Sequence, residues 1–314
     1  MSHSKASHQA KFVTGDLTKH IITMSLTSAI GFVALFAVDL ADMLFISMLG
    51  IDELAAAIGF AGTILFMTTS ISIGVAIAGG ALVAKSLGEN KPEVATELLT
   101  HVLIIGVVFA AIFASVIYLN LYGLTALIGA TGNTQELAVS YLKILTPSMP
   151  IMLVGIVASA ALRSHGAARL SMVVILVAGV VNAILDPIFI FTLKMGLDGA
   201  AWASVVSRIA MAAAAVWYIV RRYEGFSGLS FMAIKRDLKP IAAIAIPAML
   251  ANIAAPVGGA YVIKVAAEFG ESAVAGMAII GRVTPVAFAL IFAMSGAIGP
   301  IIGQNFGAEK HHRV

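Results

Sequence analysis

The stretch LFAVDLADMLFISMLG, residues 35–50, places two carboxylates, Asp39 and Asp42, in a run that is otherwise apolar. The same excess of apolar residues continues through the chain: 60% of the 314 residues are hydrophobic, 11% are charged, and the mean hydropathy is +1.02. Soluble domains are about half apolar and about a quarter charged. The apolar residues lie in blocks long enough for helices to cross a bilayer, which needs about 20 residues each. These features predict an all-α polytopic membrane protein.

Apolar runs bounded by charged or turn residues predict eight membrane-spanning helices. We expect them at approximately 18–48, 53–83, 94–121, 135–161, 167–193, 198–220, 239–267 and 271–303. The segment NLYGL, residues 120–124, is expected to end the third helix and begin an interfacial loop. The N-terminus is predicted to be retained, because the apolar run that follows the polar first residues is too long for a cleaved signal peptide. The chain has no cysteine, which excludes disulfides and Cys-ligated metals.

The distribution of Lys and Arg predicts the orientation. Fourteen of these residues lie in the N-terminal arm, the even-numbered connections and the C-terminal tail, whereas the opposite side has Lys194 and, near a helix end, Lys264. Positively charged loops stay in the cytoplasm. We therefore expect a multi-pass protein of the cell inner membrane with both termini cytoplasmic. The net charge of +3 is explained by this topology and does not indicate a nucleic-acid partner.

An internal repeat divides the chain. Residues 52–91 align without gaps on residues 271–310, with identical glycines and small residues at corresponding positions, so spans one and two resemble spans seven and eight. Parallel repeats of this kind are a transporter architecture. Because the first unit has six spans and the second has two, the sequence is expected to be truncated after the eighth helix. The predicted domains are a cytoplasmic arm (1–17), a first six-helix bundle (18–222), a cytoplasmic linker (223–238) and a partial second bundle (239–314).

Six segments in order along the chain resemble the multidrug and toxic compound extrusion (MATE) family. They are LADMLFISMLG, LGENKPE, ALRSHGAARLSM, NAILDPIFIF, GLDGAAWASVVSR and IIGQNFGAEK, and the similarity runs from about residue 12 to the end. The resemblance implies two six-helix bundles around a central cavity, of which this chain would hold the first bundle and two helices of the second. It also implies an antiporter that exports cationic or amphipathic drugs by alternating access in exchange for H⁺ or Na⁺.

Within the family, the chain resembles a prokaryotic branch, the DNA-damage-inducible transporters, whose cation site lies in the first bundle. That resemblance assigns Asp42 to a first-helix Asp, and Asn182 and Asp186 to an Asn–Asp pair in the fifth helix. Ser204 stands where a Thr is usual in the sixth helix, and Tyr141 matches a Tyr of the cavity.

The residues themselves support a cation site. An ionised Asp at the centre of a membrane costs about 2.5–3.5 kcal/mol, so such a residue is by default functional and faces a cavity or a partner. Asn182 and Asp186 are four residues apart and share a helix face. Pro187 frees a backbone carbonyl nearby. A proton or Na⁺ could bind among these oxygens and Asp42, although the acids could instead pair with a buried base such as Lys143 or Arg208.

The sequence leaves two possible roles open for several other residues in the spans. Asp39 shares a helix face with Asp42 and could be a second proton site or a hydrogen-bonding partner of a neighbouring helix. Lys143, Arg208 and Arg282 interrupt spans four, six and eight, where they either extend toward the interface or contact an acid in the cavity. Phe36, Met149 and Met152 could line a substrate cavity with Tyr141, although methionines at helical spacing are equally explained by packing.

The expected partners are drug-like small molecules and the lipid bilayer, with H⁺ or Na⁺ as coupling ion, no other cofactor and no resident metal. The segment GGALVAKS, residues 79–86, approaches a phosphate-binding loop, but Ala84 stands where that loop has glycine. We therefore expect no ATP-driven step, no enzymatic activity, and a full-length protein that is monomeric.

Two other functions compete with the antiporter. A lipid-linked oligosaccharide flippase would need a strongly cationic cavity, whereas the deep charges here include three acids. An intramembrane aspartyl hydrolase could use two carboxylates to activate water. Such enzymes have a Gly-x-Gly-Asp turn, which neither VDLAD nor NAILD provides.

Overall fold

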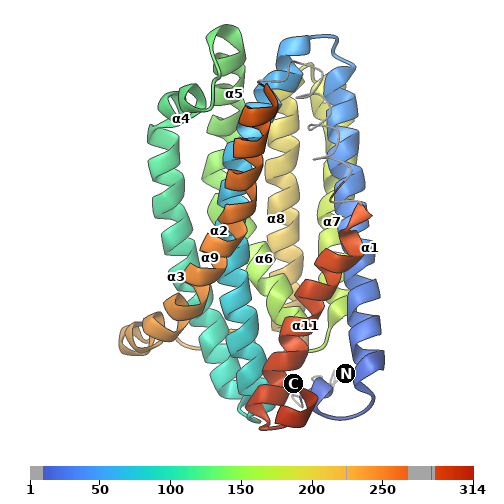
Figure 1. Cartoon of the computed structure of the whole chain (residues 1–314), viewed down its shortest axis with the longest axis vertical. Helices are drawn as coiled ribbons and strands as arrows, with labels where there is room; N and C mark the ends of the chain where they lie inside the picture. The colour runs from blue at the N-terminus through green and yellow to red at the C-terminus, as the bar shows by residue number, and fades with distance from the viewer. Residues whose placement is uncertain (1–9, 224, 268–283, 285–286) are drawn as a thin grey trace.

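The computed structural model describes residues 10–223, 225–267, 284 and 287–314, and in this part of the chain all regular secondary structure is helical. Eight of its helical segments are long and apolar enough to cross a membrane, which confirms the predicted fold class. The start of the described chain, at residue 10, and its C-terminal end lie at the same end of the molecule (Figure 1).

The spans follow the order predicted from the sequence. The first bundle contains α1 (Leu17–Ser47), α2 (Asp52–Gly88), α3 (Pro92–Leu119), α5 (Gly132–Leu145) continued by η2 (Thr146–Ser148) and α6 (Met149–Ser164), α7 (Ala168–Pro187) with η3 (Ile188–Thr192), and α8 (Gly196–Arg222). The remainder contains α9 (Phe231–Ala267) and α11 (Ala289–Gly307). Three short helices complete the described part, η1 (Lys11–Val13), α4 (Leu121–Leu127) and η4 (His311–Arg313).

Three boundaries differ from the prediction. The third span ends at Leu119 as expected, but the residues after it form the short helix α4 and not a loop. Helix α2 continues to Gly88, because its last turn holds exposed Lys85 beyond the apolar stretch and polar residues can continue a helix outside the membrane. Helix α9 begins at Phe231, so the second half of the predicted linker is helical. Most of the predicted segment 271–303 before residue 287 lies outside the described residues.

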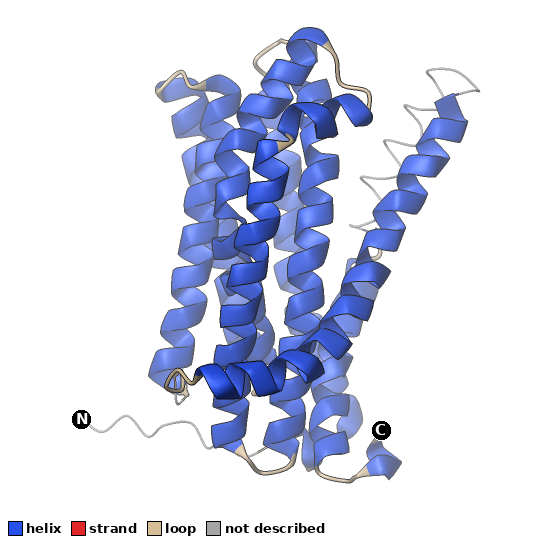
Figure 2. Cartoon of the chain, turned by 90° about the vertical axis from the view of Figure 1, so that its left-hand side faces the viewer, coloured by secondary structure: helices blue, strands red, loops and turns tan. Residues whose placement is uncertain are grey.

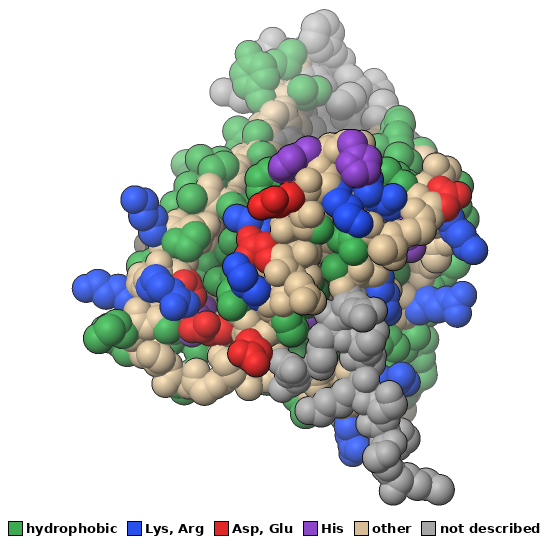
Figure 3. All heavy atoms as spheres, turned by 90° about the horizontal axis from the view of Figure 1, so that it is seen from below, with side chains coloured by type: hydrophobic (Ala, Val, Ile, Leu, Met, Phe, Trp, Pro, Cys, Tyr) green, Lys and Arg blue, Asp and Glu red, His purple; other side chains and the backbone are tan. Residues whose placement is uncertain are grey.

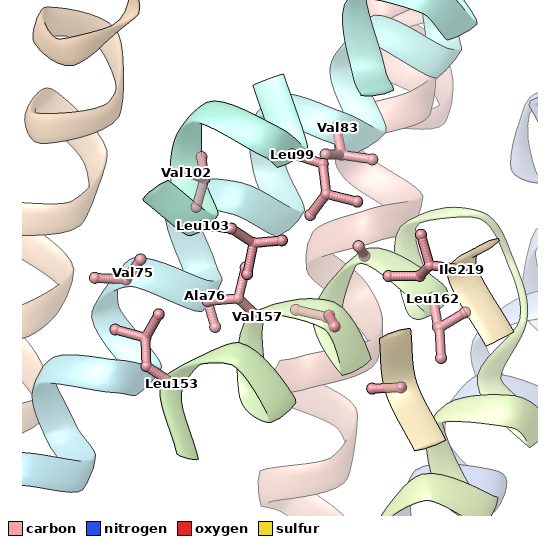
Figure 4. Packing of buried hydrophobic residues seen from close by; sticks show 14 of the residues in the cluster. Val75, Ala76, Val83, Leu99, Val102, Leu103, Leu153, Val157, Leu162 and Ile219 are labelled. Atoms are coloured by element: carbon pink, nitrogen blue, oxygen red, sulfur yellow. The ribbon is translucent and has the colours of Figure 1, made fainter. Parts of the chain in front are cut away.

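The core of the first bundle is formed by α2, α3 and α6. Val75 and Val83 of α2 pack against Leu99 of α3 and against Leu153 and Val157 of α6 (Figure 4). Glycines allow this close approach, as is usual between membrane helices. A Cβ on Gly106, for example, would lie 2.9 Å from a methyl group of Leu153.

The two units of the repeat meet through α1 packed on α11 and α2 packed on α9. Near the ends of α2 and α11 the two backbones touch, and we call this contact the glycine seam, formed by Gly88 and Lys85 of α2 with Gly307 and Gln304 of α11. A Cβ on Gly88 would collide with the carbonyl oxygen of Gln304, and a Cβ on Gly307 would collide with that of Lys85. Gly88 and Gly307 are 219 residues apart in the sequence, and so are Lys85 and Gln304. Each residue of the seam thus has its repeat equivalent on the other helix, and the contact is symmetric. The structure thus shows the two repeat units joined by equivalent residues.

The N-terminal segment is fastened to the same end of the molecule. The backbone N–H of Phe12 donates to Gln304 Oε1 at 2.8 Å, while Gln304 Nε2 donates to the carbonyl of Ser164 at 2.7 Å. Lys310 Nζ donates to the carbonyl of Val13 at 2.8 Å. Fully buried Gln304 therefore links the N-terminal segment, the end of α6 and α11. Away from this end, α9 leans away from the first bundle (Figure 2).

Candidate functional site

The proposed cation site is centred on the last turns of α7. Asn182 Nδ2 donates to Asp186 Oδ2 at 2.7 Å, as expected for residues one helical turn apart. Asp186 is fully buried and Asn182 is 8% exposed. Helix α7 ends at Pro187 and continues into the π-helical turn Ile188–Thr192. Irregular turns of this type are frequent at functional sites, because they leave backbone groups outside the regular helical pattern.

Asp42 of α1 lies beside Asn182 and Asp186 of α7. Asn182 Nδ2 lies 3.5 Å from Asp42 Oδ1, at the long limit of a hydrogen bond. The carboxyl groups of Asp42 and Asp186 are also close enough to interact directly. Asp42 therefore forms one cluster with Asn182 and Asp186, as the resemblance implied. These two residues lie on α7, which is far from α1 in the sequence but packs against it. We call this cluster the carboxylate site.

One oxygen of the carboxylate site has an open position. Asp186 Oδ1 is buried and accepts no hydrogen bond from any residue that the structure describes. A buried polar atom without a partner costs about 1–3 kcal/mol, and more when it is charged. None of the described Lys and Arg residues forms an ion pair with Asp42 or Asp186, so the alternative of a buried acid–base pair has no support there. A proton or a small cation would satisfy the open oxygen.

Tyr141 of α5 borders the site. It lies near Ser204 on α8 and is close enough to both acids, and to Arg208 on α8, to interact with their charges. Arg208, one turn after Ser204, points inward: its Nη1 donates to Ser148 Oγ at 2.7 Å and to the carbonyl of Leu145 at 3.2 Å. The guanidinium is thus held at the irregular turn between α5 and α6, and neither extends to the interface nor bonds an acid.

The other residues singled out from the sequence lie further from the cluster. Asp39 is exposed on α1, one turn before Asp42 and close enough to affect it electrostatically. Lys143 is exposed and places its Nζ 5.5 Å from the ring centroid of Tyr122. Arg282 lies outside the described residues.

The residues proposed for the substrate cavity are not equivalent. Met149 is fully buried and Met152 is 6% exposed, so both are packed inside the first bundle. Phe36 is half-buried on α1 and stacks on Phe32, with ring centroids 6.4 Å apart. Phe36 and Tyr141 are thus partly accessible, whereas both methionines are buried.

The sequence analysis missed a polar cluster where α3 meets α9. His101, fully buried, places Nδ1 2.7 Å from Oδ2 of Asp237, which is 5% exposed. Arg236 donates to both oxygens of Asp237, at 2.7 and 3.0 Å, and to Glu97 Oε1 at 3.1 Å. A histidine inside an apolar span was a signal available in the sequence, because an ionisable residue there needs a partner.

Comparison with known families agrees with this arrangement. The MatE family model matches residues 27–188 and 247–314, which is most of the chain and includes Asp42, Asn182 and Asp186. The chain belongs to the MatE family. This is a family of membrane transporters and not of enzymes, as its named relatives indicate.

Individual relatives of the family are longer than this chain. The chain is 27% identical over 299 residues to the FAD transporter of Shewanella oneidensis, covering 93% of this chain and 66% of that protein. It is 26% identical to the multidrug export protein MepA of Staphylococcus saprophyticus, covering 95% and 67%. The crystal structure of a mutant of the Vibrio cholerae MATE transporter VcmN matches with a TM-score of 0.88 and 29% identity, covering 94% and 67%. The chain thus spans about two thirds of the length of these relatives.

Proposed function

We propose that this MatE chain belongs to a secondary transporter that exports cationic or amphipathic drugs in exchange for H⁺ or Na⁺ by alternating access. The observation that carries the proposal is the carboxylate site: half-buried Asp42 of α1 beside buried Asn182 and Asp186 of α7, inside helices long enough to span a membrane, with one carboxylate oxygen unsatisfied by the described residues. The multidrug export protein among the relatives supports the same class of substrate.

The coupling step follows from the chemistry of the site. Two carboxylates that are close together repel each other when both are ionised, so one proton or one Na⁺ held between them stabilises the pair. Binding of a cationic substrate nearby would favour release of that ion, and the return of the ion would favour release of the substrate. Asp42 on α1 and Asp186 on α7 would carry the ion, while Asn182 fixes the carboxylate of Asp186.

The proposal also covers the location, orientation, oligomeric state and partners of the protein. We place the protein in the cell inner membrane with a cytoplasmic N-terminus, as a monomer that uses no ATP and no nucleic-acid partner. Its assignment to the DNA-damage-inducible branch, with a cation site in the first bundle, belongs to the same proposal. Asp39 would be a second protonation site on the path to Asp42.

A second substrate class has one observation in its favour. Arg208 is half-buried and close to Tyr141, the residue that borders the carboxylate site, and a relative is named an FAD transporter. A guanidinium at this position could bind the phosphates of an anionic cofactor. Under this alternative, FAD would be transported and ethidium would not.

The test uses inverted membrane vesicles from cells that produce the protein, with uptake of ethidium or FAD followed after a proton or Na⁺ gradient is imposed. Asp42→Asn and Asp186→Asn should each reduce gradient-driven uptake to the background of vesicles without the protein, at unchanged protein level. Asp198→Asn is the matched control, because Asp198 lies on α8 and accepts a hydrogen bond from Ser140 at 2.9 Å, outside the carboxylate site. Uptake at the parental rate in either site variant would contradict the proposed coupling role.

A further inference from the structure

The connection between α8 and α9 carries an exposed surface that the carboxylate site does not explain. We call it the interfacial patch and define it by Leu229, Phe231 and Met232 with Lys235 and Lys239. The three apolar side chains are 78%, 83% and 83% exposed, and both lysines are also exposed. Two more exposed cations, at the end of α8, lie beside it in the sequence, Arg221 and Arg222.

The opposite face of the same helical turns is fixed to the first bundle. Asp237 and Ile241 are 5% and 2% exposed, and Asp237 bonds buried His101 of α3. The backbone N–H of Ser227 also donates to Thr100 Oγ1 of α3 at 3.0 Å. Since these contacts hold the helix from one side, the exposed phenylalanine, methionine and lysines are presented outward by a fixed support.

The charges of the patch are not neutralised within the described protein. The guanidinium of Arg236 is used by Asp237 and Glu97, and it occupies the place between these carboxylates where a metal ion could otherwise sit beside His101. Lys235 and Lys239, by contrast, form no ion pair with any described acidic residue. Their counter-charge must therefore come from outside the described chain.

The position of the patch indicates the source of that charge. Helix α8 ends at Arg222, so the patch follows the end of a membrane span. The first turns of α9 run across the lower end of the molecule before the helix turns upward (Figure 2), and Lys and Arg side chains lie along the rim of this end (Figure 3). Helices that combine exposed aromatic and apolar residues with lysines lie in the headgroup region of a bilayer.

We propose that the interfacial patch binds anionic phospholipids of the leaflet at the end of the molecule where α8 ends and α9 begins. Lys235 and Lys239 contact the phosphates, while Phe231 and Met232 insert among the upper parts of the acyl chains. A soluble polyanion would neutralise the lysines but would leave these two apolar side chains in water. The hydrogen bond between His101 and Asp237 holds the start of α9 against α3. A lipid bound to the patch would therefore connect this fixed part of α9 to the bilayer.

The experiment titrates the detergent-solubilised protein with phosphatidylglycerol or phosphatidylcholine and counts bound lipids by native mass spectrometry. The double variant Lys235→Gln/Lys239→Gln should bind phosphatidylglycerol about 30-fold more weakly, as expected for the loss of two cations near an anionic surface. Its binding of phosphatidylcholine should stay the same. Raising the salt concentration should weaken phosphatidylglycerol binding in the parent and have less effect in the variant.

Two matched variants locate the effect. Lys19→Gln/Lys194→Gln removes the same charge from two other exposed lysines and should bind phosphatidylglycerol as the parent does. Phe231→Ser/Met232→Ser should weaken binding of both lipids several-fold. Unchanged phosphatidylglycerol affinity in Lys235→Gln/Lys239→Gln, or an equal loss in Lys19→Gln/Lys194→Gln, would overturn the proposal. Because the measurement is lipid binding, its result is independent of whether the protein transports drugs.

Discussion

The glycine seam and the carboxylate site differ in how they use the internal repeat. At the seam, equivalent residues of the two units meet: Gly88 packs on Gln304 and Gly307 packs on Lys85. At the carboxylate site the units are unlike, because the residues of α9 that follow Asp42 by 219 and 220 positions, Tyr261 and Val262, carry no carboxylate. The repeat is thus symmetric where the two units touch and asymmetric where the proposed ion binds. This difference suggests that the seam serves the relative movement of the units, while ion chemistry belongs to one unit alone.

The largest expected effect comes from locking the seam. A Cβ on Gly303 would lie 2.7 Å from the Cβ of Ala84, so a cysteine pair at Ala84 and Gly303 is within disulfide reach after a small adjustment of the helices. The chain has no cysteine of its own, so only the introduced pair can react. If the seam must open during transport, oxidation of Ala84→Cys/Gly303→Cys should abolish ethidium uptake into vesicles, and dithiothreitol should restore it.

A second cysteine pair within the first bundle provides the control. A Cβ on Gly80 of α2 would lie 3.7 Å from the Cβ of Ala160 on α6. The disulfide of Gly80→Cys/Ala160→Cys should form without loss of transport, since both helices belong to the same unit. Full transport by the oxidised Ala84–Gly303 pair would mean that the seam does not need to open.

A smaller effect is expected when the seam is crowded but not locked. Gly88→Ala and Gly307→Ala each place a methyl group against a backbone carbonyl that cannot turn aside, and overpacking of this kind costs about 1–3 kcal/mol. The free energy of unfolding, measured in mixed micelles of detergent and dodecyl sulfate, should fall by that amount in both variants. Similar values for the two variants would support the symmetry of the contact.

The control for crowding has the opposite expected sign. A Cβ on Gly59 of α2 or on Gly299 of α11 has no atom within 4 Å. Gly59→Ala and Gly299→Ala should leave the free energy of unfolding unchanged or raise it by up to about 1 kcal/mol, because alanine favours helix more than glycine does. If Gly59→Ala or Gly299→Ala lost as much stability as Gly88→Ala, close backbone contact at the seam would not explain the effect of Gly88→Ala.

The smallest effects are expected in the polar cluster that holds the start of α9 against α3. There the loss of stability can be compared between a variant of buried Asp237 and a variant of exposed Arg236. Asp237→Ala leaves His101 Nδ1 without its partner at a fully buried position, which should cost about 1–3 kcal/mol of stability. In Arg236→Gln, water can replace the guanidinium, which is 61% exposed, at the carboxylates of Asp237 and Glu97, so the loss should be at most about 1 kcal/mol. Equal losses in the same unfolding assay would show that the buried pair does not dominate the network.

Much of the fold could be predicted because membrane helices have a strong sequence signal. Apolar length placed the ends of the six spans of the first bundle within about five residues. It misplaced the start of α9, and most of the predicted segment 271–303 before residue 287 lies outside the described residues. The start of α9 was missed because residues 231–238 mix apolar and basic side chains, which lack the uniform hydrophobicity of a span but suit an interfacial helix. The short helix α4 was missed for a related reason: seven residues are too few to show a periodic pattern.

The candidate site was predictable in part. The acids stood out because carboxylates are rare in spans. The spacing of Asn182 and Asp186 predicted that they share a helix face, where the structure shows a hydrogen bond between them. The approach of Asp42 from a distant helix depended on the family resemblance. Neither the pairing of His101 with Asp237 nor the inward position of Arg208 could be predicted, because both depend on which helices pack together.

The proposed coupling requires that Asp42 and Asp186 act as a single cation site, and this requirement can be tested by non-additivity. Purified protein in weakly buffered detergent solution is mixed with ethidium, and H⁺ release is followed with a pH indicator and Na⁺ release with a sodium electrode. A single site predicts release of one of these ions by the parent and by Asp198→Asn. It predicts none by Asp42→Asn, Asp186→Asn or the double variant, since residues that act as a unit are lost together. Partial release by each single variant, with the two losses adding up in the double variant, would show two independent groups and contradict a shared site.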